Sequence, residues 1–263
     1  MAQQAVEQNE LNQEEGMTLL EHLREMRDRV FKAVLAVILG FVVGLVLSEQ
    51  ILVFIKQPYH DYLMVTSPTE AITNVFTVSL TFGVAIAMPV IVYQVMAFVM
   101  PGLLPNEKKW VYLGVPAATL LFVIGAAFCW YLFLPSALGF LTTIYPSVFT
   151  YKLKPDEYVP FVMSLVFWIG IAFEMPIFVF VLAKANVVTA RVLARQWRYA
   201  VVIIAIVAAI ITPTPDPINM SIVMAPLLVL YVLSIGMAYL ARRGKTTPAL
   251  IDTFDDTKES TPD

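Results

Sequence analysis

Six long apolar runs constrain what this chain can fold into more than any other feature of its sequence. They cover residues 30–47, 72–100, 110–134, 161–183, 199–211 and 218–240. Five of them approach or exceed the roughly 20 residues that a helix needs to cross a bilayer. All six are longer than the roughly 10-residue strands of an outer-membrane barrel. Only 14% of the residues are charged, against about 25% in soluble domains. The sequence therefore predicts an all-α integral membrane protein with six transmembrane helices.

Lysine and arginine residues are distributed unevenly between the two sides of these spans. Fourteen of the 17 lie before or at the start of the first span, in the loops after the second and fourth spans, and after the sixth. The other side holds Lys56, Lys152 and Lys154. Because cytoplasmic loops are enriched in lysine and arginine, both chain ends are predicted to be cytoplasmic.

The lengths of the spans and their prolines predict an open shape. The fifth run has 13 residues, which make a helix of about 20 Å against a hydrocarbon core of about 30 Å. Prolines, which tend to kink helices, lie inside or at the ends of spans at Pro89, Pro116, Pro176 and Pro226. We expect a concave bundle over residues 18–243. The polar, acidic segments 1–17 and 244–263 are predicted to be disordered tails.

Glu174 is the only charged residue in the fourth run. A carboxylate at bilayer depth costs about 2.5–3.5 kcal/mol on insertion scales, so this side chain is expected to be paired, neutral or functional. Gln94 on the second run lies about 9 Å from the cytoplasmic boundary and Glu174 about 14 Å from it. These similar depths make a hydrogen bond between the two side chains plausible. In one interpretation, a protonated Glu174 bonds to Gln94 and serves stability alone.

Two cytoplasmic segments also carry acidic residues. In residues 18–32, apolar side chains recur at helical spacing, which gives one face suited to the membrane surface. The opposite face is charged, and Glu25 and Arg29 are placed for an i,i+4 ion pair. Glu107 lies in the short loop between the second and third runs. Taken alone, both segments are consistent with solvated charges.

Four segments follow one another along the chain: HLREMRDR, MPVIVYQVMAFVMPGLLPNEKK, AFEMPIFVFVL, and ITPTPDP followed by MAPLL. In this order they resemble the TatC family, the multi-spanning receptor subunits of twin-arginine protein translocases. The resemblance covers about residues 17–243. It implies a receptor in the bacterial cytoplasmic membrane that binds signal peptides carrying an Arg-Arg pair. It also implies transport of folded proteins with TatA and TatB partners, driven by the proton motive force, and self-association.

The resemblance assigns roles to particular residues. Glu25 and Glu107 match the two family glutamates that recognise the arginine pair, and a carboxylate can grip a guanidinium bidentately. Phe98 matches an aromatic residue near that site, and Arg27 matches an arginine of the N-terminal segment. Glu174 matches a family glutamate that faces a concave groove. The resemblance therefore gives a second interpretation of Glu174, in which it makes the wall of this groove polar where translocation or partner docking begins.

The turn at residues 212–217 and the start of the sixth run resemble the place where the family contacts its single-span partners. The residues implied are Thr212, Asp216 and Met220. Here the chain departs from the pattern, because Met220 stands where the family commonly has a polar residue and TPTPDP has an extra Thr-Pro. A basic residue common in the family near the start of the second span is also replaced, around Thr77.

The main alternative function is an ion-coupled transporter of small solutes. Such proteins usually contain internal repeats around a site at mid-membrane depth, and we find no such repeat in this sequence. An intramembrane enzyme is a further alternative, but the metal and serine-hydrolase motifs are absent and only two histidines and one cysteine occur. We expect no enzyme activity, cofactor, metal or nucleic-acid partner.

Overall fold

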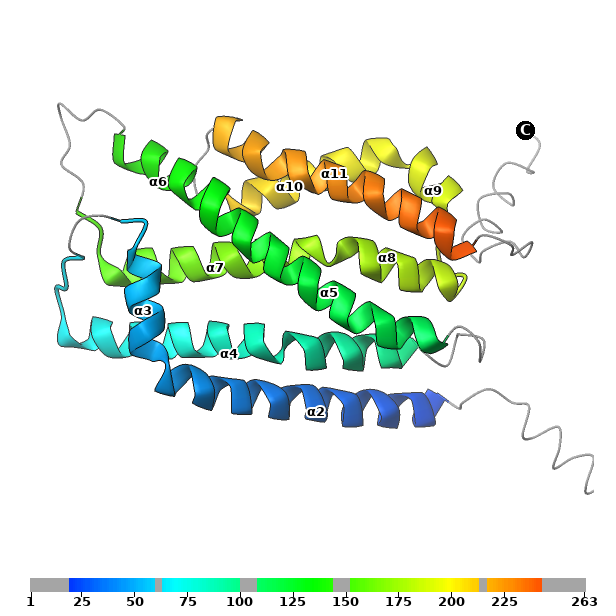
Figure 1. Ribbon diagram of the computed structural model, residues 1–263, viewed down its shortest axis with the longest axis horizontal. Helices are drawn as coiled ribbons and strands as arrows, with labels where there is room; N and C mark the ends of the chain where they lie inside the picture. The colour runs from blue at the N-terminus through cyan, green and yellow to red at the C-terminus, as the bar shows by residue number, and fades with distance from the viewer. Residues whose placement is uncertain (1–18, 60–62, 100–107, 144–151, 213–216, 243–263) are drawn as a thin grey trace, which may run out of the picture.

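The computed structural model describes residues 19–59, 63–99, 108–143, 152–212 and 217–242 (Figure 1). The two predicted tails, residues 1–17 and 244–263, lie outside this part of the chain. The described residues form helices joined by short connections. These helices are α2 (Leu19–Val46), α3 (Ser48–Lys56), α4 (Pro68–Val99), α5 (Lys108–Phe128), the π-helical turn η2 (Cys129–Phe133), α6 (Leu134–Thr143), α7 (Pro155–Phe173), α8 (Met175–Lys184), α9 (Ala190–Arg195), α10 (Trp197–Ile211) and α11 (Pro217–Arg242).

The six predicted spans correspond to helices of the structure. Five segments are long and apolar enough to cross a membrane, namely α2, α4, α5–η2–α6, α7–α8 and α11. The remaining span, which is the fifth along the chain, is the shorter α10, with 15 residues and a length of about 22 Å. The start of α2 and the end of α11 lie at the same end of the molecule (Figure 1), which the lysine and arginine distribution identifies as cytoplasmic. The all-helical fold class is confirmed.

The N-terminal segment differs from its expected place on the membrane surface. α2 runs without interruption from Leu19 to Val46, so residues 19–32 are the first turns of the first span. The segment contains neither glycine nor proline before Gly40, so nothing in it ends the helix. A 28-residue helix is about 42 Å long, which exceeds the hydrocarbon core by about 12 Å. The charged turns of α2 therefore extend beyond the core on the cytoplasmic side.

Two other span boundaries also lie outside the predicted runs. The third span continues through η2 and α6 as far as Thr143. The fourth begins at Pro155, six residues before the first residue of its apolar run. Proline is favoured in the first turn of a helix, and Asp156 and Glu157 in that turn complement the helix dipole. Charged residues at a helix start lower the hydropathy of a span without ending its helix.

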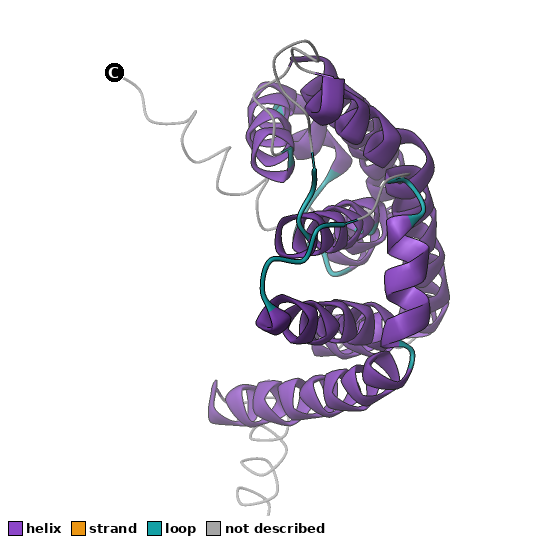
Figure 2. Cartoon of the chain, turned by 90° about the vertical axis from the view of Figure 1, so that its left-hand side faces the viewer, coloured by secondary structure: helices purple, strands orange, loops and turns teal. Residues whose placement is uncertain are grey.

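Seen along the long helices, the bundle follows a curve that is open on one side (Figure 2). The helices α4, α5 and α11 continue through Pro89, Pro116 and Pro226. Pro176 instead coincides with the break between α7 and α8. α3 lies across the extracytoplasmic end (Figure 1), where the Tyr158 hydroxyl of α7 donates a 2.8 Å hydrogen bond to the Ile55 carbonyl.

Glycines bring α2 and α4 into close backbone contact. A Cβ atom added to Gly40 would lie 2.3 Å from the carbonyl oxygen of Gly83, and one added to Gly44 would lie 2.4 Å from that of Ser79. Small residues at such spacing let membrane helices approach closely and gain packing energy. This contact fixes the extracytoplasmic half of α2 against α4, and the cytoplasmic ends of the two helices form the pocket described below.

Replacing Gly83 by alanine is expected to destabilise the protein. The new Cβ would lie 2.5 Å from the Phe41 amide nitrogen, and helix backbone cannot move aside as a flexible side chain can. Overpacking of this kind costs about 1–3 kcal/mol, so the melting temperature of the purified protein should fall. Gly236→Ala is the matched control, because no atom lies within 4 Å of its added Cβ. Equal melting temperatures for the two variants would contradict the close contact.

Candidate functional site

A pocket opens between the cytoplasmic ends of α2 and α4. Its volume is about 210 Å³. The α2 wall consists of residues 26, 29, 30 and 33, and the α4 wall consists of residues 91, 94, 95 and 98, so each wall is one helical face. The lining residues are Met26, Arg29, Val30, Ala33, Ile91, Gln94, Val95 and Phe98. We call this site the α2–α4 pocket. It is mainly apolar, and Arg29 and Gln94 are its polar residues.

Glu25 lies beside the α2–α4 pocket and is ion-paired with Arg29, as the i,i+4 spacing predicts. The Arg29 Nε donates a 2.9 Å hydrogen bond to Oε1 of Glu25, and Arg29 Nη2 donates to the same oxygen. Each side chain of the pair is 22% exposed, so the pair is not a fully solvated one. Oε2 of Glu25 is buried and has no hydrogen-bond partner among the residues that the structure describes. Half of this carboxylate is therefore unsatisfied.

The structure brings some of the predicted binding residues together and separates another. Glu25 and Phe98 lie beside or within the α2–α4 pocket, whereas Arg27 is directed elsewhere. The Arg27 side chain is 75% exposed and pairs with Asp28 at 2.9 Å. Glu107 lies outside the described residues. The walls supplied by Ile91 and Val95 were not identified from the sequence, although their spacing with Phe98 is that of one helical face.

Glu174 lies at the junction of α7 and α8. Its amide donates to the Ile171 carbonyl at 3.0 Å, and the Ile177 amide donates to its carbonyl at the same distance. Both bonds span three residues, which marks a locally tightened turn. Pro176 lacks the amide hydrogen that would continue the α-helical pattern to Ala172. The missing donor at Pro176 therefore contributes to the interruption of the helix beside Glu174.

The Glu174 side chain is almost completely enclosed. It is 1% exposed, and its Oε1 is buried without a hydrogen-bond partner in the described part of the chain. The hydrogen bond between Glu174 and Gln94 that their similar depths made plausible is not formed among the described residues, where Oε1 of Glu174 has no partner and Gln94 lines the α2–α4 pocket. Equal depth placed the two residues at the same level of the membrane but did not fix the directions of their side chains. An unsatisfied buried acceptor costs about 1–3 kcal/mol, so Glu174 is an energetically costly residue in this conformation.

The predicted partner site lies at the α10–α11 connection. Thr212 follows the last residue of α10, is buried, and donates its hydroxyl to the Ala208 carbonyl. Met220, in the first turns of α11, packs half-buried against the main core. Asp216 lies outside the described residues. The neighbouring Asn219 is buried and accepts a 2.9 Å hydrogen bond from the Ser136 hydroxyl of α6, a link that the sequence did not reveal.

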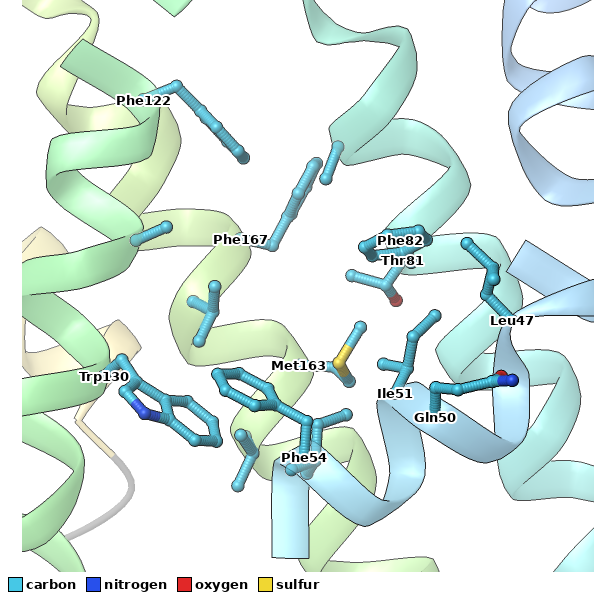
Figure 3. A pocket seen from close by; sticks show the side chains of 15 residues that line it. Leu47, Gln50, Ile51, Phe54, Thr81, Phe82, Phe122, Trp130, Met163 and Phe167 are labelled. Carbon is cyan, nitrogen blue, oxygen red and sulfur yellow. The ribbon is translucent and has the colours of Figure 1, made fainter. Parts of the chain in front are cut away.

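A larger pocket, of about 420 Å³, lies towards the extracytoplasmic end between α3, α4, α5–η2 and α7. Figure 3 shows Phe54, Trp130 and Met163 among its lining side chains, and the Phe54 and Trp130 rings stack at 4.2 Å. Gln50 and Thr81 are polar, and none of the lining residues is charged. This pocket offers no group that would select a charged ligand, in contrast to the one beside Glu25.

Comparison with known proteins gives consistent matches over most of the chain. The model of the family described as Sec-independent protein translocase protein (TatC) matches residues 21–226. The Sec-independent protein translocase protein TatC of Koribacter versatilis is 36% identical over 86% of this chain and 86% of its own length. That of Aquifex aeolicus is 38% identical over 87% of this chain and 98% of its own length. A crystal structure of the twin arginine translocase receptor TatC is 36% identical, with a TM-score of 0.73 over 85% of this chain and all of the matched chain.

Proposed function

Because the chain belongs to the TatC family of Sec-independent protein translocase proteins, we propose that it is the receptor component of a twin-arginine translocation system. In this role it is a multi-pass protein of the bacterial cytoplasmic membrane. It binds signal peptides that carry an Arg-Arg pair and takes part in moving folded proteins across the membrane. It is not an enzyme, and the proton motive force supplies the energy for transport.

The observation that carries this proposal is the half-satisfied carboxylate of Glu25 beside the apolar α2–α4 pocket. An ionised carboxylate offers about four acceptor positions. Arg29 donates to Oε1, and the buried Oε2 has no partner. A guanidinium from a bound peptide that gains access to this buried oxygen would donate to Oε2 and leave the bonds from Arg29 to Oε1 in place. The arginine of the peptide would thereby satisfy an acceptor that is costly to leave empty.

The apolar lining accounts for the second part of a signal peptide. A signal peptide has a positively charged region followed by 7–15 apolar residues. Met26, Val30 and Val95 are exposed apolar side chains that line the pocket, so apolar side chains that follow the arginines can pack against them. Phe98 contributes an aromatic ring to the same wall. Glu107 is proposed as the second carboxylate, and the role of Arg27 stays a prediction.

Glu174 is proposed to serve a step after peptide binding. It belongs to α7–α8, the most buried of the five long spans, and lies ten residues before the cytoplasmic end of α8, or about 15 Å along the helix. In the α2–α4 pocket, Arg29 is already paired with the carboxylate of Glu25. A second carboxylate at membrane depth is therefore better explained by a polar path for transport or partner docking than by peptide recognition.

The α10–α11 region is proposed as the contact for TatA and TatB partners. α10 is shorter than the hydrocarbon core, and short spans thin the bilayer or associate with neighbours. Its outer face is apolar and exposed at Ile203, Ile206 and Ile210. Thr212, Asp216 and Met220 are the candidate contact residues at the connection. Self-association of the chain is proposed as well.

The proposal is tested by comparing two signal peptides that differ only in carrying Arg-Arg or Lys-Lys. With a photocrosslinking residue in place of Val95 in the α2–α4 pocket, the Arg-Arg peptide should crosslink roughly tenfold more strongly. A guanidinium forms bidentate charge-assisted bonds, whereas an ammonium acts as a point charge. Equal crosslinking of the two peptides would contradict a receptor selective for arginine.

A further inference from the structure

A second groove on the cytoplasmic half of the protein takes no part in the function proposed above. It lies between α5, α8 and the end of α11 and has a volume of about 400 Å³. In Figure 1, α5 and α11 diverge towards the cytoplasmic end with α8 beside them. The residues lining the groove are Trp110, Leu113, Gly114, Ala117, Ile177, Phe180, Lys184, Met237 and Leu240. We call it the α5–α11 groove.

Two ammonium groups lie close to the indole ring of Trp110, which lines this groove. The Lys184 Nζ lies 5.6 Å from the centre of the Trp110 ring, and the Lys109 Nζ lies 6.0 Å from it. Lys184 Nζ also lies 6.0 Å from the Phe180 ring, and the Trp110 and Phe180 rings meet edge to face at 5.7 Å. These attractive contacts with the ring faces hold both cations near one aromatic pair.

The groove runs from the membrane surface into the hydrocarbon core. Lys109 is in the first turn of α5, and Lys184 is the last residue of α8, so both cations lie at the cytoplasmic boundary. Ala117, eight residues beyond Lys109, is about 12 Å deeper. The lining below the cations is apolar, and Leu113 and Leu240 are exposed at its edges. Tryptophan and lysine at the boundary with apolar residues beneath them match the layers of a lipid leaflet.

We propose that the α5–α11 groove binds an anionic phospholipid of the cytoplasmic leaflet. The phosphate is bound by the ammonium group of Lys184, which lines the groove, with the Lys109 ammonium group nearby; each has three donors. One acyl chain lies along Leu113, Ala117 and Met237. Basic pockets between membrane helices on the cytoplasmic side are suited to such head groups.

A lipid fits this groove better than a peptide does. The walls beneath the lysines provide no polar side chain, so the backbone amides and carbonyls of an extended peptide would be left without partners at membrane depth. An acyl chain has no such groups to satisfy. The two cations then select the head group, because a zwitterionic lipid carries a positive charge beside its phosphate.

The test measures lipid bound to the purified, delipidated protein by native mass spectrometry. The probes are phosphatidylglycerol and phosphatidylcholine with the same acyl chains. Lys184→Gln should reduce phosphatidylglycerol binding roughly fivefold, which corresponds to the loss of one lysine at an anionic surface. Lys184→Arg should retain binding. Lys32→Gln is the matched control, because Lys32 is an exposed lysine on the cytoplasmic part of α2 and does not line the groove.

A second variant tests the place of the acyl chain. Ala117→Leu fills the groove beneath the lysines and should reduce binding of phosphatidylglycerol while all the cations stay in place. The proposal is overturned if Lys184→Gln and Lys32→Gln lower binding equally, if phosphatidylcholine binds as well as phosphatidylglycerol, or if Ala117→Leu binds as the parent does.

Discussion

Replacing Glu25 by alanine is expected to weaken binding of an Arg-Arg signal peptide by at least tenfold. Oε2 of Glu25 is the buried, unpartnered acceptor beside the α2–α4 pocket, and its removal leaves an incoming guanidinium without its carboxylate. A hydrogen bond to a charged group contributes about 1.5–3 kcal/mol, and 1.4 kcal/mol is a factor of ten in affinity. Binding is measured with a labelled peptide and the purified protein, and membrane insertion is checked in the same preparation.

Two variants on the same helix separate recognition from general effects of charge. Asp28→Ala removes a carboxylate that pairs with Arg27 on the exposed side of α2, so peptide binding should be unchanged. Arg29→Gln removes the internal partner of Glu25 but leaves the carboxylate, so binding should be retained. If Glu25→Ala and Asp28→Ala weaken binding to the same extent, only the net charge of α2 matters, and the recognition role of Glu25 is wrong.

Most of the fold followed from the sequence because a bilayer imposes a simple rule on chain segments. A backbone that crosses hydrocarbon must satisfy its own hydrogen bonds, so long apolar runs become helices. The predicted helix boundaries were wrong where charged residues continue a helix beyond its apolar run. Residues 19–32 are charged and nevertheless continue α2, and Asp156 and Glu157 occupy the first turn of α7. Hydropathy identifies the part of a helix in lipid, not the whole helix.

The candidate site was less predictable because it depends on contacts between helices. The pairing of Glu25 with Arg29 is local, and its i,i+4 spacing predicts it. The α4 wall of the pocket depends instead on how α2 lies against α4, which the contact of Gly40 with Gly83 fixes. The spacing of Gly40 and Gly44 could have indicated a close helix contact, but not its partner. The Glu174–Gln94 bond, which similar depths made plausible, is not formed among the described residues, because depth along a helix does not determine the direction of a side chain.

Replacing Glu174 by leucine is expected to abolish export of folded cargo while membrane insertion and signal-peptide binding are preserved. The buried Oε1 of Glu174 has no hydrogen-bond partner, so leucine removes a costly group and the melting temperature should stay the same or rise. The Glu25 carboxylate and the α2–α4 pocket are unaltered, so crosslinking of the Arg-Arg peptide should match the parent protein. A polar path at the α7–α8 junction, however, would lose its carboxylate.

Two further variants distinguish a transport role from a structural one. Glu174→Gln keeps hydrogen-bonding groups at the junction and should retain part of the export. Gln94→Leu removes the polar group that lies in the α2–α4 pocket. It should therefore not show the result expected of Glu174→Leu, which is lost export with intact peptide binding. The measurements are export of a folded reporter and peptide crosslinking in the same cells. Normal export by Glu174→Leu would show that Glu174 is not part of the transport path.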